Sequence, residues 1–363
     1  MSPSGKNPAM IVREEDPLNA GPQPDPQCSS FLTPNDLFFV RNHAAVPDLD
    51  PAAYRLSVGG MVKNPLTLTL DELKNRYPAH SLPATLMCAG NRREELLPIG
   101  EIKGEVPWNL EAISTAEWRG VLLRDVLAEA EIDPGAAHIA FVGADQIKKD
   151  GATFGFGASI PLEKALNSDV LLAYAMNDQP LPPAHGFPVR GLVPGYIGAR
   201  SVKWLTEIIV QAEPSDNYYQ SAAYRWFPPN VSEDTADWGN APMLGGLIVN
   251  AAICCPQPGE TLRPGRHTVR GFGLATDGER LERVELSIDG GQTWMNALLG
   301  EHDAPYAWRL WQVEIDFVPG VYELMVRATD TGGHLMPEHL RDTWNFKGYM
   351  NNAWHRVRVD VRS

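Results

Sequence analysis

The stretch 226–243, WFPPNVSEDTADWGNAPM, constrains the fold most, because proline, glycine and acidic residues alternate in it without any apolar period. Such a composition is typical of a connection between two domains. The sequence follows different patterns on its two sides. We therefore place a boundary near residue 240 and predict two folded units, residues 36–240 and 241–363.

The first unit mixes strand and helix patterns. Tyr54, Leu56 and Val58 alternate with other residues as in a half-buried strand. The spacing from Thr69 to Glu72 is that of a capping box, which predicts a helix start. Segment 121–130, VLLRDVLAEA, has helix-forming residues at most positions and an apolar i, i+4 face, so we predict a helix there. The fold class is therefore α+β, with a mixed α/β first domain.

The second unit shows strand patterns only. The segment 285–294, ELSIDGGQTW, pairs alternation with an Asp-Gly-Gly turn, and 321–330 and 355–361 are further alternating runs. Several short strands within about 120 residues predict a β-sandwich. Residues 1–35, rich in Pro, Asn and Asp, are predicted to form an extended arm on the body of the protein.

Composition limits the partners and the location. The net charge of −14 argues against a nucleic acid or an anionic membrane as the main partner. No apolar run approaches the ~18–20 residues of a membrane span, and the N-terminus has no apolar signal core. We expect a cytoplasmic protein, or a periplasmic one if the chain is a mature form. The four cysteines show no C-x-x-C pair, so we expect mostly reduced thiols.

One cysteine lies in an unusual setting. The chain has no H-E-x-x-H, G-x-S-x-G or Walker motif, which removes the main support for hydrolase and nucleotide functions. In LMCAGNRRE an apolar strand, 82–87, ends at Cys88 and is followed by Arg92 and Arg93. Neighbouring cations favour a thiolate, which is a soft metal ligand or a nucleophile. The alternative is a buried apolar Cys88 beside surface arginines.

A metal at Cys88 would have to bring most of its own ligands. No second Cys or His stands at ligand spacing, which points to an organic metal cofactor. Three polar stretches, 38–43, 185–195 and 198–204, combine cationic side chains with glycine or backbone donors, as binding of a large anionic cofactor requires. Singly, each cation could pair with an acidic residue; the clustering favours a site.

Several motifs together resemble the sulfite oxidases, a family of molybdenum-cofactor enzymes. The resemblance runs from about residue 34 to 361 and rests on TPNDLFFVRNH, LMCAGNRRE, EAISTAEWRGVLLRDVL, LLAYAMND, HGFPVR, VPGYIGARSVKWL and NNAWHRV. The C-terminal part resembles the immunoglobulin-like dimerisation domain of that family. The resemblance therefore implies a homodimer that pairs through the C-terminal domain.

The resemblance also implies the site residues. Cys88 would supply the protein thiolate to molybdenum, with two dithiolene sulfurs of a molybdopterin. Cofactor contacts are implied for Phe39, Arg41, Asn42, His43, Cys88, Asp145, His185, Arg190, Ser201, Val202 and Lys203. With Cys88, the catalytic and substrate-pocket positions would be Arg41, Arg93, Lys103, Trp108, Tyr224 and Lys347.

The implied reaction is the two-electron oxidation of sulfite to sulfate. Arg41, Arg93 and Lys347 would attract the oxyanion against the overall negative charge, Tyr224 would donate a hydrogen bond and Trp108 would wall the pocket. Animal members carry a haem domain, for which the arm is too short. We therefore expect no haem, and electron transfer to oxygen or to an external carrier such as a cytochrome.

The sequence departs from the family pattern at three places. Lys347 stands where sulfite-oxidising members usually have Arg, which keeps the charge but loses the bidentate fork. Ala223 replaces a common acidic residue before Tyr224, and Trp108 follows Lys103 with one residue more than usual. These departures predict a pocket of different shape and selectivity.

Two other functions are compatible with parts of the sequence. A nitrate-reductase-like or other oxyanion oxidoreductase would share the Cys, Arg and pterin motifs and differ only in pocket residues. A non-catalytic β-sandwich binding protein would use the Cys and Arg clusters structurally. It leaves unexplained why Cys88, Arg93, His185, Arg190 and Lys203 match positions of one cofactor site.

Overall fold

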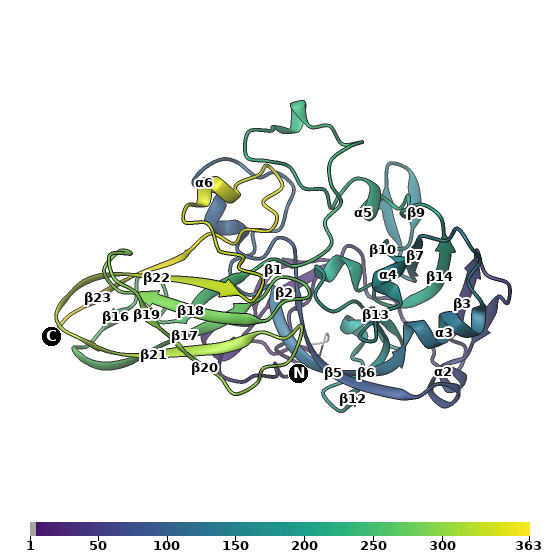
Figure 1. Cartoon of the computed structure of the whole chain (residues 1–363), viewed down its shortest axis with the longest axis horizontal. Coiled ribbons are helices and arrows are strands. Elements are labelled where there is room, and N and C mark those ends of the chain that lie inside the picture. The colour runs from purple at the N-terminus through teal and green to yellow at the C-terminus, as the bar shows by residue number, and fades with distance from the viewer. Residues whose placement is uncertain (1–4) are drawn as a thin grey trace.

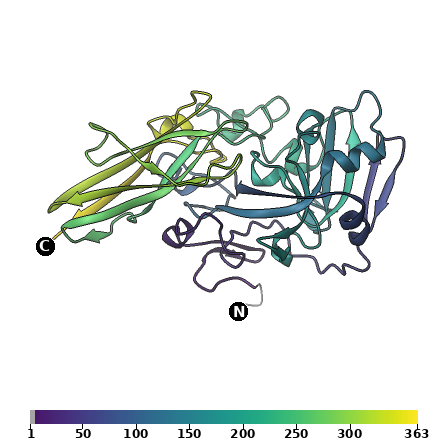
Figure 2. The same ribbon diagram turned by 60° about the horizontal axis from the view of Figure 1, so that its bottom comes forward.

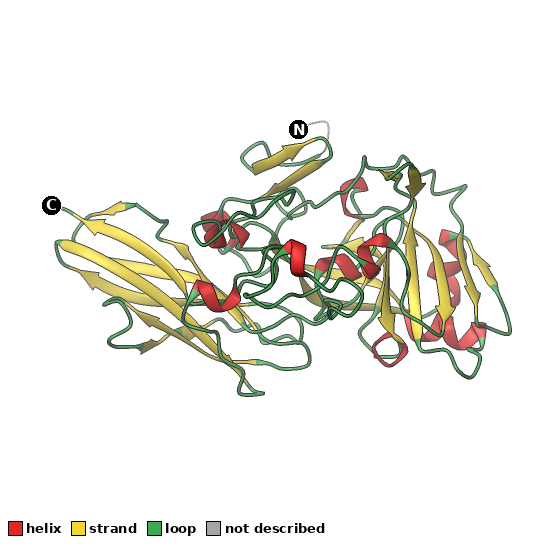
Figure 3. Ribbon diagram, turned by 90° about the horizontal axis from the view of Figure 1, so that it is seen from above, coloured by secondary structure: helices red, strands yellow, loops and turns green. Residues whose placement is uncertain are grey.

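Two strand-rich lobes lie side by side along the longest axis of the molecule (Figure 1). This computed structural model describes residues 5–363. The N-terminal half of the chain forms one lobe, and the C-terminal residues form the other. Figure 3 shows that strands predominate in both and that the helices are short. Over residues 5–363, no helix reaches the length and apolar character needed to cross a bilayer.

Two five-stranded sheets build the first lobe. One has the order β10-β7-β14-β3-β4, in which only the β14–β3 pairing is parallel. Its strands are β3 (Leu56–Gly60), β4 (Leu66–Leu68), β7 (His138–Gly143), β10 (Gly157–Pro161) and β14 (Leu205–Gln211). The other is antiparallel, with the order β12-β11-β6-β5 and β13 also pairing with β11. Its strands are β5 (Ala79–Met87), β6 (Ile113–Leu122), β11 (Leu171–Met176), β12 (Gln179–Pro180) and β13 (Arg190–Leu192).

The helix predictions are confirmed with one shift. Helix α2 (Leu70–Arg76) begins at the predicted capping box: the Glu72 N–H donates to Thr69 Oγ1 at 3.1 Å, and the Thr69 N–H donates to the Glu72 carboxylate at 2.8 Å. Helix α3 (Leu123–Ala130) starts two residues later than predicted. The reason is that Val121 still pairs with Ala79 in the β5–β6 ladder, so tertiary pairing overrides the local helix preference.

The C-terminal lobe is the predicted two-sheet sandwich. One sheet has the order β15-β17-β21-β20, with β15 (Asn250–Cys255), β17 (Gly265–Leu274), β20 (Leu298–Leu299) and β21 (Arg309–Phe317). The other has the order β16-β23-β22-β18-β19, with β16 (Thr261–Leu262), β18 (Leu281–Ser287), β19 (Met295–Asn296), β22 (Gly320–Asp330) and β23 (His355–Val361). Both sheets contribute to one apolar cluster that includes Ile253, Phe317 and Val357. The runs 321–330 and 355–361 lie in β22 and β23, whereas the run 285–294 contains only the end of β18 and the turn that leads to β19.

The N-terminal arm lies where the two lobes meet (Figure 2). It is more ordered than predicted: beyond residues 1–4, which lie outside the described residues, it forms β1 (Ile11–Glu15), β2 (Leu18–Gly21) and α1 (Pro24–Gln27). Reciprocal backbone hydrogen bonds join Ala20 to Val40, at 3.1 and 2.7 Å. The arm is also tied to the first lobe by Arg13, whose Nε lies 2.5 Å from the buried carboxylate of Glu111.

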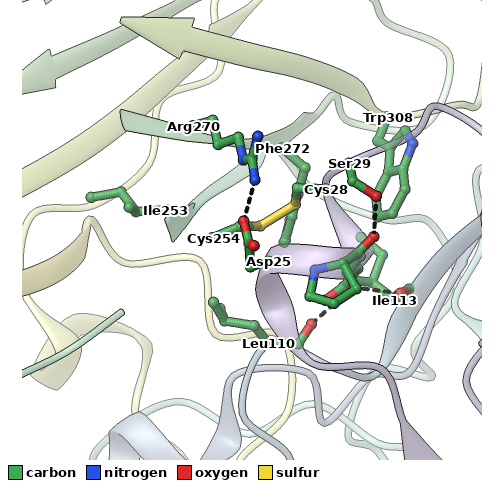
Figure 4. Close-up of a disulfide and its surroundings, with 12 residues drawn as sticks. Asp25, Cys28, Ser29, Leu110, Ile113, Ile253, Cys254, Arg270, Phe272 and Trp308 are labelled. Atoms are coloured by element: carbon green, nitrogen blue, oxygen red, sulfur yellow. Dashed lines mark hydrogen bonds and ion pairs between the residues drawn. A yellow bond between two sulfur atoms is a disulfide. The ribbon is translucent and has the colours of Figure 1, made fainter. Parts of the chain in front are cut away.

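A disulfide links the arm to the C-terminal lobe (Figure 4). Cys28, directly after α1, bonds to Cys254 of β15, and beside the bridge Arg270 pairs with Asp25. The expectation of mostly reduced thiols is therefore wrong for this pair. The sequence missed it because 226 residues separate the two cysteines and only the fold brings them together. The cytoplasmic location stays a prediction. The disulfide would be unusual there, because disulfides persist mainly in oxidising compartments.

The disulfide predicts the number of titratable thiols. Denatured, unreduced protein should show two thiols per chain, from Cys88 and Cys255, and reduction should raise the number to four. Titration with a chromophoric disulfide reagent measures both values. Four thiols before reduction would contradict the bridge.

One buried arginine joins the two lobes. Arg92 is fully buried, and its guanidinium donates to Asn250 Oδ1 and to the Ala353 carbonyl, both at 2.7 Å. It also makes two hydrogen bonds to the Glu95 carboxylate, at 2.7 and 2.8 Å. Since Asn250 and Ala353 belong to the C-terminal lobe, this single side chain satisfies polar groups on both sides of the interface.

Removing the Arg92 charge should destabilise the whole chain. Arg92→Met leaves the Glu95 carboxylate without its main partner and several acceptors unpaired, which costs about 3–5 kcal/mol. Arg92→Lys should cost less because it keeps the charge. Urea denaturation of both variants measures the effect, with exposed Arg119→Met as the control expected within about 0.5 kcal/mol of wild type. Equal stability of Arg92→Met and wild type would refute this role.

Candidate active site

A cavity opens in the first lobe. Four chain segments meet in its wall, around residues 38–43, 86–89, 184–190 and 198–204. All eleven positions with implied cofactor contacts line this one cavity: Phe39, Arg41, Asn42, His43, Cys88, Asp145, His185, Arg190, Ser201, Val202 and Lys203. Tyr224 of the implied substrate pocket lines it as well.

Cys88 is placed in the wall by β5. The predicted strand 82–87 is confirmed as the end of β5, and the Cys88 N–H continues its pairing by donating to the Ala112 carbonyl at 2.9 Å. The Gly90 N–H lies 3.5 Å from the Cys88 sulfur. Within residues 5–363 no three His, Cys, Asp or Glu side chains form a ligand group. A metal bound at this thiol therefore needs ligands that come with it.

Buried positive charge defines the far side of the cavity. Within residues 5–363 the guanidinium of Arg190 donates only to carbonyls, those of His185 at 3.0 Å and Ser201 at 2.8 Å among them. Burial lowers the pKa of Arg190 to about 9. Lys203 donates to the Ala184 carbonyl at 3.0 Å and to Asn42, and burial, with Arg190 next, lowers its pKa. The ion pairs found within residues 5–363 involve neither side chain. A bound anion would restore the balance.

The two histidines of the cavity are held neutral. Burial lowers the pKa of His43 below its ordinary value, with Arg41 and Lys203 adding to the effect. Burial also lowers the pKa of His185, followed by the charges of nearby lysines and Arg190. Neutral imidazoles can accept or donate hydrogen bonds without adding charge. The cavity thus combines neutral hydrogen-bonding groups with fixed cations, which fits a large anionic ligand that also carries polar ring atoms.

The N-terminal arm contributes a lysine that the sequence did not single out. The Lys6 ammonium donates to the carbonyls of Asn35 and Phe38, both at 2.7 Å, and lies 2.5 Å from His185 Nε2. It connects the arm, the loop that precedes Phe39 and the 3₁₀ turn η2 (Pro183–His185). Burial lowers the pKa of Lys6 to about 7. Nothing in the sequence around Lys6 distinguishes it from a surface lysine.

Aromatic side chains and Arg41 form the near side. The Tyr224 hydroxyl lies 3.3 Å from His43 Nε2, and its ring stacks on Tyr349 with centroids 5.4 Å apart. Burial raises the pKa of Tyr224, so its hydroxyl stays protonated and can donate. The Arg41 guanidinium is held by the Asn42 carbonyl at 2.5 Å and by Asn19 Oδ1 of the arm at 3.3 Å.

Arg93 and Lys347 lie beside the cavity and share one carboxylate. Glu105 is 2.5 Å from the Lys347 ammonium and 3.4 Å from the Arg93 guanidinium. The Tyr349 hydroxyl donates to the same carboxylate at 3.2 Å, and Arg93 lies over the Tyr349 ring. Sequence reasoning missed Glu105 and Tyr349. A signal existed, since Glu105 lies in the short segment whose length differs from the family pattern.

Two implied pocket residues are not brought to the cavity. The Lys103 side chain is 72% exposed and pairs with Glu101 at 3.6 Å. Trp108 is fully buried in the apolar cluster behind Cys88, and its indole N–H has no hydrogen-bond partner within residues 5–363. Gly104, with a φ of +67°, turns the chain between them. This turn and the extra residue direct Lys103 outward and Trp108 inward.

The comparisons with known proteins agree with this site. The model of the oxidoreductase molybdopterin binding domain matches residues 43–219, and that of the Mo-co oxidoreductase dimerisation domain matches residues 242–362. The chain thus combines a molybdopterin-binding oxidoreductase domain with a dimerisation domain. Arg190 and Lys203 form no ion pair within residues 5–363, and no group of protein ligands surrounds the Cys88 thiol there. Both features fit a molybdenum cofactor, an anionic pterin whose sulfurs bind the metal.

Relatives narrow the class to one family. The mitochondrial sulfite oxidase of Homo sapiens is 44% identical over 98% of this chain and 66% of the relative, so the chain spans about two thirds of that protein. The sulfite oxidase of Arabidopsis thaliana is 36% identical over 97% of this chain and 94% of the relative. The crystal structure of the sulfane dehydrogenase SoxCD from Paracoccus pantotrophus matches with a TM-score of 0.80 at 25% identity, covering 99% and 87% of the two chains. The protein belongs to the sulfite oxidase family.

The lowered pKa of Lys6 predicts that the stability of the cofactor-free protein depends on pH. Between the folded pKa of about 7 and the ordinary value of 10.5, the unfolded chain binds more protons at Lys6 than the folded chain does. The free energy of unfolding that Lys6 controls should therefore be flat below pH 7 and rise above it, by a few kcal/mol in all.

Thermal melts of wild type and Lys6→Met from pH 6 to pH 10 measure this contribution. The melting temperature of wild type relative to the variant should climb by several degrees across the upper half of the range. Exposed Lys148→Met is the control and should give a difference from wild type that does not change with pH. A constant difference for Lys6→Met would disprove the effect.

Proposed function

We propose that this protein oxidises sulfite to sulfate at a molybdenum cofactor. The observation that carries the proposal is that one cavity is lined by Cys88, by the buried cations Arg190 and Lys203, and by the pair Arg41 and Tyr224. Membership of the sulfite oxidase family supports the same activity. When bound, the cofactor supplies the two-electron oxo transfer, and every other step depends on this chain's own residues.

The far side of the cavity would hold the cofactor. Arg190 and Lys203 would bind its phosphate, since both are buried cations whose present partners are carbonyl and amide oxygens. His43, His185 and Asp145 would contact the polar ring atoms. The Cys88 thiolate would bind the metal. Arg190, Lys203 and His185 are held by hydrogen bonds to neighbouring protein groups, so little reorganisation should accompany cofactor binding.

The near side would receive the oxyanion. Arg41 lines the cavity, and Arg93 and Lys347 lie beside it, so three cations create a locally positive field in a chain of net charge −14. Tyr224 would orient the anion by donating from its protonated hydroxyl. The rings of Tyr219, Phe156 and Tyr349 surround this position and limit the access of water.

The C-terminal sandwich would make the protein a homodimer. The dimerisation-domain match supports this, and we propose an immunoglobulin-like form for the sandwich, since its two sheets share one apolar core. Light scattering of the purified protein should give about twice the 39.9 kDa chain mass. The electrons would pass to oxygen or to an external carrier.

The decisive experiment compares wild type with Cys88→Ser made in a host that produces the cofactor. Wild type should contain about one molybdenum per chain and reduce an artificial acceptor when sulfite is added. The variant should lose sulfite turnover by at least 1,000-fold, because a serine hydroxyl stays protonated and binds the metal poorly. Molybdenum present in wild type without sulfite turnover would refute sulfite as the substrate.

A second oxyanion function rests on one observation. The pair Lys347 and Glu105 gives the anion pocket a cation without a bidentate fork and a carboxylate beside it. A lysine binds an oxyanion less directionally than an arginine does, so this arrangement suits another oxyanion reaction, such as nitrate reduction at the same metal. Turnover of nitrate by the reduced enzyme, in the absence of sulfite turnover, would favour it.

A further inference from the structure

The carboxylate of Glu105 occupies an anion-binding position beside the cavity. Its Oε1 lies 2.5 Å from the Lys347 ammonium and accepts from the Tyr349 hydroxyl at 3.2 Å, while its Oε2 lies 3.4 Å from Arg93. Two cations and a hydroxyl thus surround one carboxylate. The side chains are 12% exposed for Glu105 and 3% for Arg93, so these contacts are largely shielded from water.

The position is the one a substrate oxyanion would seek. Cationic groups bind carboxylates and sulfur oxyanions through the same charge-assisted hydrogen bonds to paired oxygens. Arg93 and Lys347 are two of the three cations available to a substrate on the near side of the cavity. In the structure both of them already have an anion of their own, whereas Arg41 has no carboxylate within ion-pair distance in the described chain, residues 5–363.

The field of Glu105 reaches the cavity itself. Burial is the largest influence on the pKa of Tyr224 and raises it, and Glu105 and Cys88 both add to that rise. Burial opposes the charge of Arg41, but Tyr224, Cys88 and Glu105 outweigh it, so the pKa of Arg41 is raised. Glu105 therefore acts on the same side chains as the thiol of Cys88.

We propose that Glu105 is a specificity-determining residue: an internal carboxylate that competes with the substrate oxyanion for Arg93 and Lys347. An entering oxyanion displaces Glu105 from Lys347 and takes over its donors. The competition weakens the binding of dianions most, because a dianion is also repelled by the displaced carboxylate nearby. The effect of Glu105 on sulfite and sulfate binding during turnover rests on the proposed function. Its competition with anions for Arg93 and Lys347 does not.

A purely structural role predicts the opposite. If Glu105 only held Arg93 and Lys347 in place, its neutralisation would disorder both cations and weaken anion binding. The direction of the change in anion affinity therefore separates the two roles.

The test measures binding of sulfate and nitrate to the holoenzyme by calorimetry. Glu105→Gln should bind sulfate about tenfold more tightly than wild type, and nitrate should gain by a smaller factor, since removal of one charge favours a dianion more. The KM for sulfite should fall with little change in kcat. Glu105→Asp keeps the charge and should stay near wild type.

Two controls locate the effect. Glu101→Gln removes one charge from an exposed position on the same segment, where the side chain is 76% exposed, and should leave sulfate binding unchanged. Adding Lys347→Met to Glu105→Gln should remove the gain, because the released donor is lost. Sulfate affinity in Glu105→Gln equal to or weaker than wild type would overturn the proposal.

A crystal structure of the wild-type holoenzyme with sulfate tests the same idea without a variant. Sulfate should lie within hydrogen-bond distance of Arg93 and Lys347, with the Glu105 carboxylate displaced. Sulfate bound only elsewhere, with Glu105 still paired, would also overturn it. Neither the calorimetry nor the crystal structure requires turnover. A protein inactive with sulfite would therefore refute the proposed function without affecting the test of competition by Glu105.

Discussion

Burial of Arg190 and Lys203 without an ion-pair partner in the described chain, residues 5–363, is the constraint on which the rest of the structure depends. Removal from water opposes the charge of Arg190 and Lys203 and lowers both pKa values, although Asp145 partly offsets this for Lys203. Within residues 5–363 their hydrogen bonds go to carbonyl and amide oxygens. Such an arrangement persists only where the surrounding backbone fixes it. Here β13 holds Arg190, and the segment after η3 (Gly198–Arg200) holds Lys203. The sheets of the first lobe thus hold the cations Arg190 and Lys203 in place, and an anionic cofactor would neutralise them.

Local sequence patterns predicted the elements well where one period dominates. The capping box at Thr69, the strand ending at Cys88 and the alternation of 355–361 all carry their structural information within a few residues. The start of α3 could not be predicted in this way, because Val121 is kept in β6 by its partners in β5 and β11. Likewise the bond between Cys28 and Cys254 depends on how the arm lies against β15, which neither neighbourhood encodes.

The same difference between local motifs and distant contacts decides which residues of the candidate site could be predicted. Residues within contiguous motifs, such as Arg41 to His43 or Ser201 to Lys203, were found from the sequence, because each motif carries several polar groups together. Glu105 and Lys6 were not found, since each is a single charged residue whose role comes from distant partners. Lys103 and Trp108 show the converse: one additional residue and a left-handed turn at Gly104 suffice to take two residues away from a cavity that their motif implies.

The order in which the chain is made follows from where the site residues stand. Lys6 from the arm, Cys88 from the first sheet and Tyr349 from a loop between the last two strands all meet around one cavity. A nascent chain therefore lacks the Tyr349 ring that stacks on Tyr224 of the cavity wall until nearly its last residues have left the ribosome. The contacts of Glu105 with Lys347 and Tyr349 likewise form only when the chain is nearly complete, so the anion-binding side of the cavity is the last part to be assembled.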